Sequence, residues 1–192
     1  MSNRKEDILI VALHLFARDG YEAVSVSQIA GELDMTKGAL YRHYKSKRDI
    51  FDSIVKRMEQ QDGEQASDYD MPEEYKDVSL DNFVEYSKSM FEYWTEDDFA
   101  SSFRKMLTIE QFRSEEMQNL YQQYLVSGPA EYVKDLFKNM KMNHPEENAV
   151  KFYANMFFYY SLYDGAANKT KAKSQFEQML DRIIEEMKKY EL

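Results

Sequence analysis

The stretch SVSQIAGELDMTKGALYRHYKSK, residues 25–47, carries the pattern that decides the fold of this chain. Ser25 is followed three positions later by Gln28, which has the form of a capping box at the start of a helix. Apolar residues after it predict a helix of barely two turns, and Thr36 can cap the next helix after a tight connection at Asp34-Met35. Two short helices joined by a turn of about four residues are the parts of a helix-turn-helix.

The second of these helices has two different faces. Leu40 and Tyr44 are expected to face the core, whereas Lys37, Tyr41 and Lys45 line the opposite side at a spacing of four residues. That side is free to contact a partner, and the major groove of B-DNA admits one α-helix. Spacing alone leaves a second interpretation open, a helical hairpin that only packs inside the protein.

The distribution of charge favours the DNA interpretation. The whole chain has a net charge of −10, but residues 1–58 hold ten basic and eight acidic residues, so that they carry +2 and the remainder carries −12. Residues 36–48 contain five basic residues and no acidic one. A purely solvated helix face usually mixes the two signs, so this run is typical of a surface that binds phosphate.

The flanking residues predict further helices. An apolar stripe between Ile8 and Phe16 predicts a first helix that ends at Gly20, and Ser46 with Asp49 predicts the cap of a fourth helix that continues to Met58. Residues 59–77 are acidic and polar and are expected to form a helix tail and a linker. We therefore expect two domains, a DNA-binding domain at 1–58 and a C-terminal domain for effector binding and dimerisation at 59–192.

The composition predicts an all-α fold with no catalytic chemistry. There are only six glycines and three prolines, and no cysteine is present, which allows a reducing, cytoplasmic location. No secretory signal or long apolar run is evident, so no membrane association is expected. The three histidines, at 14, 43 and 144, have no metal-ligand spacing, and no nucleophile motif or glycine-rich phosphate loop is present, so neither an enzyme nor a cofactor is expected.

The C-terminal part is rich in aromatic residues, with twelve of the fifteen tyrosines after residue 58. Any one of them can simply fill the core. A pocket for an apolar or aromatic small molecule is the alternative. Its candidate lining residues are Phe91, Trp94, Phe103, Met106, Tyr121, Tyr124 and Tyr153. The acidic residues Glu85, Glu92 and Glu110 would favour a cationic ligand, although solvated acidic faces explain them equally well.

Residues 146–164 predict a helix that is apolar nearly all round and must be covered on several sides. One side is expected to meet the last helix, about 170–190, of a second copy of the chain in a four-helix interface. The candidate interface residues are Phe157, Tyr160, Phe176, Leu180, Ile183, Ile184 and Met187.

Two segments, residues 20–30 and residues 35–47, closely resemble the N-terminal signature of the TetR/AcrR family of transcriptional regulators. The resemblance covers about residues 5–55. It implies nine or so helices, with the first three forming a DNA-binding head, the fourth linking that head to the ligand domain, and the last two forming a dimer interface.

The resemblance also implies which residues contact DNA. Carried over by position, these residues are Ser25, Ser27, Thr36, Lys37, Gly38, Tyr41, His43 and Lys47. Arg42 stands at a position that varies in the family and is our candidate for direct reading of a base. Asp34 departs from the glycine that is usual in the turn, but aspartate tolerates the left-handed conformation.

The expected function is that of a homodimeric repressor. Two recognition helices about 34 Å apart would read a near-palindromic operator in double-stranded DNA, and a small-molecule effector would release it. Two alternatives stay open: a DNA regulator that answers to a protein partner or to no ligand, and a helical interaction module without DNA binding.

Overall fold

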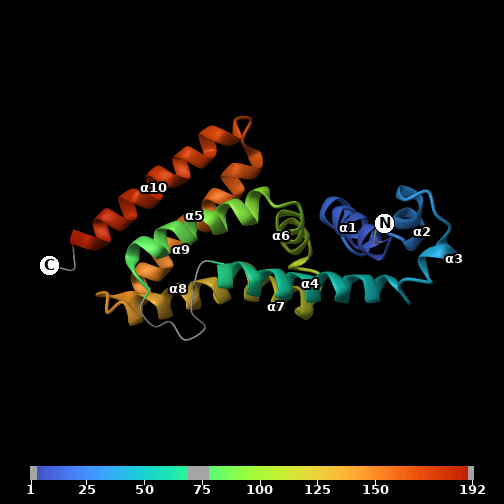
Figure 1. Cartoon of the computed structure of the whole chain (residues 1–192), viewed down its shortest axis with the longest axis horizontal. Coiled ribbons are helices and arrows are strands. Elements are labelled where there is room, and N and C mark those ends of the chain that lie inside the picture. Colours follow the sequence, from blue (N-terminus) through green and yellow to red (C-terminus); the bar gives the residue numbers. More distant parts are fainter. Residues whose placement is uncertain (1–3, 69–77, 190–192) are drawn as a thin grey trace. The chain divides into compact units, whose positions relative to one another are not determined.

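The structure is a computed structural model that describes residues 4–68 and 78–189 (Figure 1). Within these ranges it contains helices and no strand, which confirms the predicted all-α fold. The helices are α1 (Arg4–Asp19), α2 (Val26–Glu32), α3 (Lys37–Leu40), α4 (Lys47–Asp68), α5 (Leu80–Glu96), α6 (Asp98–Glu110), α7 (Glu115–Leu125), α8 (Ser127–Asn139), α9 (Pro145–Gly165) and α10 (Lys169–Lys189).

The helices form two compact units that do not coincide with two consecutive halves of the chain. Unit 1 comprises residues 1–65 and 98–121, and unit 2 comprises residues 66–97 and 122–192. Unit 1 therefore joins the helix-turn-helix to α6 and the first part of α7. The predicted boundary at residue 58 divides the chain by function, and as such it stays a prediction.

Unit 1 is organised around α1, which packs along α6 (Figure 1). The predicted apolar stripe of α1 is buried, with Ile8, Leu13 and Phe16 fully inside. Ile29 from α2 and Phe51 from α4 are equally buried. Burial of these large apolar side chains is the main source of stability for short helices such as α2 and α3, which would not persist alone in water.

The local signals in the N-terminal sequence form the turns that they predict. Gly20 closes the end of α1 with a φ of +86°, and Asp34 takes a φ of +52° in the turn between α2 and α3. Ser25 and Gln28 form the reciprocal capping box, and the Thr36 hydroxyl accepts the Ala39 amide at 3.2 Å. These elements depend on residues three or four positions apart, which explains why the sequence predicts them well.

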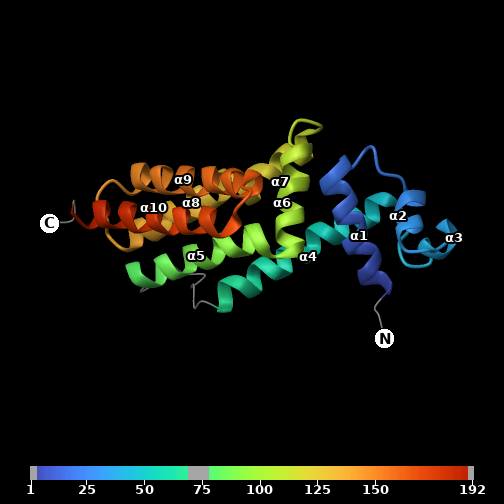
Figure 2. The ribbon, with the colours of Figure 1, turned by 90° about the horizontal axis from the view of Figure 1, so that it is seen from above.

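Unit 2 is built on α9, which packs against α8 and α10 and also contacts α5 (Figure 2). Aromatic rings fill its interior. Phe83 meets the rings of Phe137 and Phe152, with centroids 5.1 and 4.9 Å away. Phe91 stacks between Phe176 and Tyr160, at 3.9 and 5.6 Å.

The part of α9 that its neighbours in unit 2 leave uncovered is still apolar. Val150 is 62% exposed, Phe158 58% and Leu162 38%. The predicted all-round apolar character of this helix therefore divides into a buried face and an exposed face.

The predicted helix tail after Met58 forms as far as Asp68, where α4 ends. The rest of the predicted linker, residues 69–77, lies outside the described residues. None of the described helices is both long enough and apolar enough to cross a membrane.

Candidate nucleic-acid interface

The helix-turn-helix in unit 1 presents a polar surface. On the side of this segment that faces the protein interior, Leu40 and Tyr44 are buried, as predicted. The Tyr44 hydroxyl donates a hydrogen bond to the Lys5 carbonyl at 3.1 Å, which anchors the end of this segment to α1. Burial raises the pKa of Tyr44 to about 12, so the phenol stays protonated and remains a donor at any physiological pH.

The residues expected to contact DNA lie on the solvent side of this segment. These exposed positions, which we call the outward row, lie on α2, α3, their N-caps and the turn that follows α3: Ser25, Ser27, Thr36, Lys37, Gly38, Tyr41, Arg42 and His43. The continuous helix α3 is only four residues long, and residues 41–43 continue it as a turn held by backbone hydrogen bonds to the carbonyls of residues 37, 39 and 40. The outward row thus comes from a helix and a turn together.

The cations of this surface are available to an outside anion. Within the described residues, no carboxylate lies within ion-pair distance of the charged groups of Lys37, Arg42 or Lys45, although these side chains are exposed. The Lys37 ammonium lies 5.8 Å from the centre of the Tyr41 ring, which keeps that side chain over the aromatic face. An exposed positive surface without internal counter-charges is suited to bind phosphate groups.

Lys47 is placed differently from the other predicted DNA contacts. Its ammonium donates to the Tyr21 carbonyl at 2.7 Å and to the Glu22 carbonyl at 3.4 Å, and its side chain is only 22% exposed. The structure therefore engages this lysine inside unit 1 and does not gather it with the outward row.

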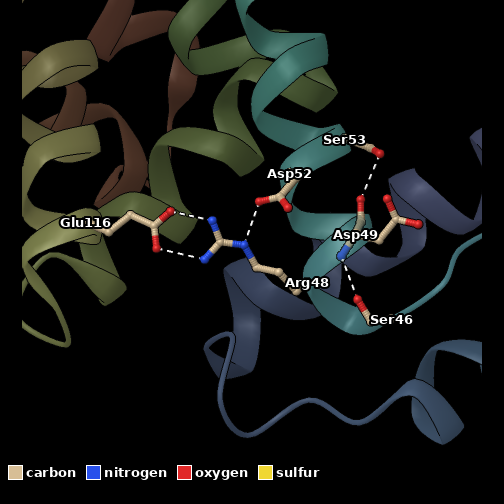
Figure 3. Close-up of polar contacts among 6 residues, drawn as sticks. All are labelled: Ser46, Arg48, Asp49, Asp52, Ser53 and Glu116. Atoms are coloured by element: carbon tan, nitrogen blue, oxygen red, sulfur yellow. Dashed lines mark hydrogen bonds and ion pairs between the residues drawn. The ribbon is translucent and has the colours of Figure 1, made fainter.

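A second cation beside this surface, Arg48, is held by two acidic groups (Figure 3). Its guanidinium makes two parallel hydrogen bonds to Glu116 on α7, at 2.6 and 2.8 Å, and a third to Asp52, at 2.6 Å. These bonds lower the pKa of Glu116 and raise that of Arg48. No local pattern in the sequence indicates this pair, because the two residues are 68 positions apart.

The predicted effector-pocket residues do not gather in one unit. All seven are buried, but Phe103, Met106 and Tyr121 belong to unit 1 and the other four to unit 2. Tyr153 donates its hydroxyl to the Leu125 carbonyl at 2.9 Å, as a core tyrosine does. The pocket stays a prediction.

The acidic residues considered for a cationic ligand all have partners inside the chain. Glu85 lies 3.0 Å from the Lys88 ammonium, and Glu92 pairs with Lys173. Glu110 accepts the backbone N–H of Tyr21 at 2.9 Å.

The predicted dimer-interface residues are mostly buried within the single chain, and their role in a dimer stays a prediction. Six of the seven, Tyr160, Phe176, Leu180, Ile183, Ile184 and Met187, are buried within the single chain, and only Phe157 is partly exposed. The reason is that α10 turns its apolar stripe toward α9 of its own chain. The apolar residues left on the surface of α9 are those around Phe158, which periodicity does not separate from the buried ones.

The comparison with protein families agrees with this geometry. Residues 8–54 match the family described as bacterial regulatory proteins, tetR family. The chain is 38% identical over 65 residues to the HTH-type transcriptional regulator AcrR of Shigella flexneri, and it is 38% identical over 58 residues to the nucleoid occlusion factor SlmA of Escherichia coli. These matches cover 34% and 30% of this chain and less than a third of either relative.

Solved structures resemble the whole chain. A TetR-family transcriptional regulator from Marinobacter aquaeolei has a TM-score of 0.65, with 18% identity, and the match covers 99% of both chains. The fold is therefore an all-helical one with an N-terminal helix-turn-helix, like that of this structure. Residues 8–54 therefore resemble the N-terminal domain of the tetR family of bacterial regulatory proteins, and the whole chain has the fold of solved TetR-family structures.

Proposed function

We propose that this protein is a transcriptional regulator that binds double-stranded DNA through the outward row of α2, α3 and the turn after α3. The observation that carries the proposal is the exposed cationic surface of Lys37, Arg42 and Lys45, with no carboxylate within ion-pair distance in the described residues. The phosphates that border the major groove of DNA can bind such a positive surface on a helix-turn-helix.

The outward residues divide into two roles. The lysines and hydroxyl groups position the protein on phosphates without reading sequence. Arg42 is exposed on the turn after α3 and can reach a base edge, where guanine offers two acceptors to one guanidinium.

A salt series tests this function. The full chain is titrated against a random-sequence duplex at several salt concentrations, with Lys37→Ala as the variant. The slope of log affinity against log salt is expected to fall in magnitude by about 0.9 when one phosphate contact is lost. Lys56→Ala is the matched control, because Lys56 is exposed on α4, away from the outward row. The absence of duplex binding by the wild-type chain, or binding that salt does not weaken, refutes the proposal.

The proposed active form is a homodimer that uses the exposed face of α9. Val150, Phe158 and Leu162 are exposed there, and the small residues Ala154 and Ser161 on the same face allow close approach of a second helix. A groove of about 430 Å³ near the end of α9, lined in part by Leu162, Gly165 and Gln175, adjoins this face. A two-fold pair would cover the same apolar surface on both copies.

Release of the operator by a small molecule completes the proposal, with repression in the cytoplasm as its mode. A structural relative from Saccharomonospora viridis, with a TM-score of 0.70 and 18% identity over 96% of this chain and 97% of its own, is in complex with choline, which supports a ligand-binding role for this fold. A ligand acts only if its affinity differs between the DNA-bound and released forms. The test measures operator affinity with and without a saturating concentration of choline or of an apolar aromatic compound. If a compound binds the chain but leaves operator affinity unchanged, the coupling is contradicted for that compound.

A further inference from the structure

The turn between α1 and α2 is held from two other helices at one residue, Tyr21. Its backbone N–H donates to the Glu110 carboxylate of α6 at 2.9 Å. Its carbonyl accepts the ammonium of Lys47, the first residue of α4, at 2.7 Å. Its ring meets the rings of Phe16 and Phe51 edge-on, at 5.1 and 5.2 Å. The last residue of α6 and the first residue of α4 therefore bind the N–H and the carbonyl group of the same residue.

The carboxylate in this arrangement is buried in an unusual place. Glu110 is the last residue of α6 and only 2% exposed, although burial of a carboxylate is unfavourable unless it is hydrogen-bonded. A Cβ atom at Gly20 would lie only 2.8 Å from the Oε1 atom of Glu110. The absence of a side chain at Gly20 therefore provides the space that the carboxylate occupies. The φ of +86° at Gly20 also suits glycine and turns the chain toward Glu110.

Lys47 also contacts the turn through the ring of Tyr21. Its Nζ atom lies 4.3 Å from the centre of the Tyr21 ring, in addition to its hydrogen bonds to two carbonyl groups. An ammonium with these partners is desolvated on one side and stabilised by the ring. Its contacts are those of a brace within unit 1.

The position of the turn gives these contacts a functional consequence. Ser25, the N-cap of α2, follows Tyr21 by four residues, and no regular helix lies between them. The direction of α2, and through the tight turn at Asp34 that of α3, depends on where Tyr21 is held. We propose that Glu110 and Lys47 are positioning residues that clamp Tyr21 and so set the orientation of the helix-turn-helix for sequence-specific reading. This inference rests on the proposed function.

The clamp predicts a difference between two kinds of DNA binding. Specific reading requires the recognition segment to be oriented closely against the base edges, whereas non-specific binding is electrostatic and tolerates a looser head. Loss of the clamp should therefore weaken binding to a preferred duplex far more than binding to an arbitrary one. A contribution to folding alone would weaken both equally.

The experiment uses a duplex selected by the wild-type full chain from a random library, and a scrambled duplex of the same length. Glu110→Ala is expected to lose at least about tenfold in affinity for the selected duplex and less than about twofold for the scrambled one. Glu110→Gln keeps a carbonyl that can accept the Tyr21 N–H and is expected to restore most of the loss. Glu115→Ala is the matched control, because that carboxylate is exposed on α7.

Lys47→Ala separates the clamp from a direct phosphate contact. As a clamp residue it should reduce affinity for the selected duplex and leave the salt slope on the scrambled duplex unchanged. A phosphate contact would instead reduce the slope by about 0.9 on both duplexes, and that result would overturn the role assigned to Lys47.

Hydrogen exchange of the Tyr21 amide tests the clamp without DNA. Glu110→Ala should accelerate this exchange by at least about tenfold while the amides around Ile54 in α4 stay protected. Unchanged exchange, or equal loss of affinity for both duplexes, overturns the inference. A wild-type chain that selects no duplex refutes the proposed function, and the exchange experiment still decides whether the clamp exists.

Discussion

The solvent side of the α2–α3 segment and the exposed face of α9 are the two surfaces proposed to bind a partner, and they differ in chemistry. The first presents lysine, arginine and hydroxyl groups, with Lys37 and Arg42 exposed. The second presents Val150, Phe158 and Leu162, which are 38–62% exposed. Charged and hydroxyl groups on the α2–α3 surface interact favourably with water, whereas the apolar side chains of α9 do not.

This difference indicates how each surface meets its partner. A hydrated cationic surface is stable in water and binds by releasing counterions from DNA, so its affinity depends on salt. An exposed apolar face gains about 25 cal/mol per Å² when it is covered, so it favours permanent association with a second copy. We therefore expect the α9 face to be covered constantly and the α2–α3 face to be covered only on DNA.

The largest expected effect is on the apolar face. Phe158→Asp would place a carboxylate in the proposed interface of both copies at once, and an unpaired buried charge is strongly unfavourable. The dissociation constant of the dimer is expected to rise at least about 100-fold, as measured by sedimentation equilibrium.

Phe112→Asp is the matched control for this change, because Phe112 is 89% exposed on the turn after α6 and lies in unit 1. It should leave the oligomeric state unchanged. A wild-type chain that sediments as a monomer at all concentrations would contradict the proposed dimer through the exposed face of α9.

The next effect is on the cationic face. At Gly38 a Cβ atom would have only the Thr36 hydroxyl nearby, at 3.9 Å, so the free protein has room for Gly38→Ala. We expect unchanged or slightly higher stability but about tenfold weaker duplex binding, about 1.4 kcal/mol, because the methyl group separates the backbone from DNA.

Gly31→Ala is the control for the glycine experiment, since nothing lies within 4 Å of a Cβ at that position. Its duplex affinity is expected to stay within about twofold of wild type. Equal affinities for both variants would show that the backbone around Gly38 does not approach DNA closely.

A smaller, selective effect is expected at Arg42. Arg42→Ala should reduce discrimination at one base pair of the selected site by about 1–3 kcal/mol, because it removes a bidentate contact to a base edge. The comparison is with Lys45→Ala, which should weaken binding to all sequences about equally. Binding to a panel of single-base variants of the site measures both, and uniform loss for Arg42→Ala would assign that residue to the backbone.

The smallest effect concerns the ion pair beside the cationic face. Arg48 lowers the pKa of Glu116 from its ordinary value of 4.5, so the contribution to stability is present above that value and is lost as the pH falls through the lowered pKa. Both side chains are about half exposed, so we expect less than about 1 kcal/mol.

Urea unfolding of wild type and Glu116→Gln measures this contribution. The two free energies of unfolding should differ at pH 7 and converge as the pH falls below the lowered pKa of Glu116. A difference that persists at low pH would mean that the stabilisation does not come from the charged pair.

Prediction from the sequence succeeded where the cause is local. The capping box at Ser25, the cap at Thr36, the closing turn at Gly20 and the burial of Leu40 each depend on neighbours within one helical turn. The DNA-contact candidates are implied by the family resemblance; eight of them are exposed, and their contact with DNA stays a prediction.

Prediction was less complete where distant segments meet. The position of Lys47 within its helix shows only that it starts α4, whereas the structure shows its ammonium on the Tyr21 carbonyl. Neither Glu110 at that turn nor Glu116 beside Arg48 has a signal in sequence, because each pair is separated by more than 60 positions.

The amino-acid sequence by itself determines that this chain is helical, where the helix-turn-helix lies and which of its side chains turn outward, because capping and helical periodicity act within a few residues. Only the tertiary structure decides which cations stay exposed, which bind backbone carbonyl groups inside the protein as Lys47 does, and which apolar residues of α9 stay exposed. Those outcomes depend on which helices pack together, and a nearly all-apolar helix carries no periodic signal that selects its covered face.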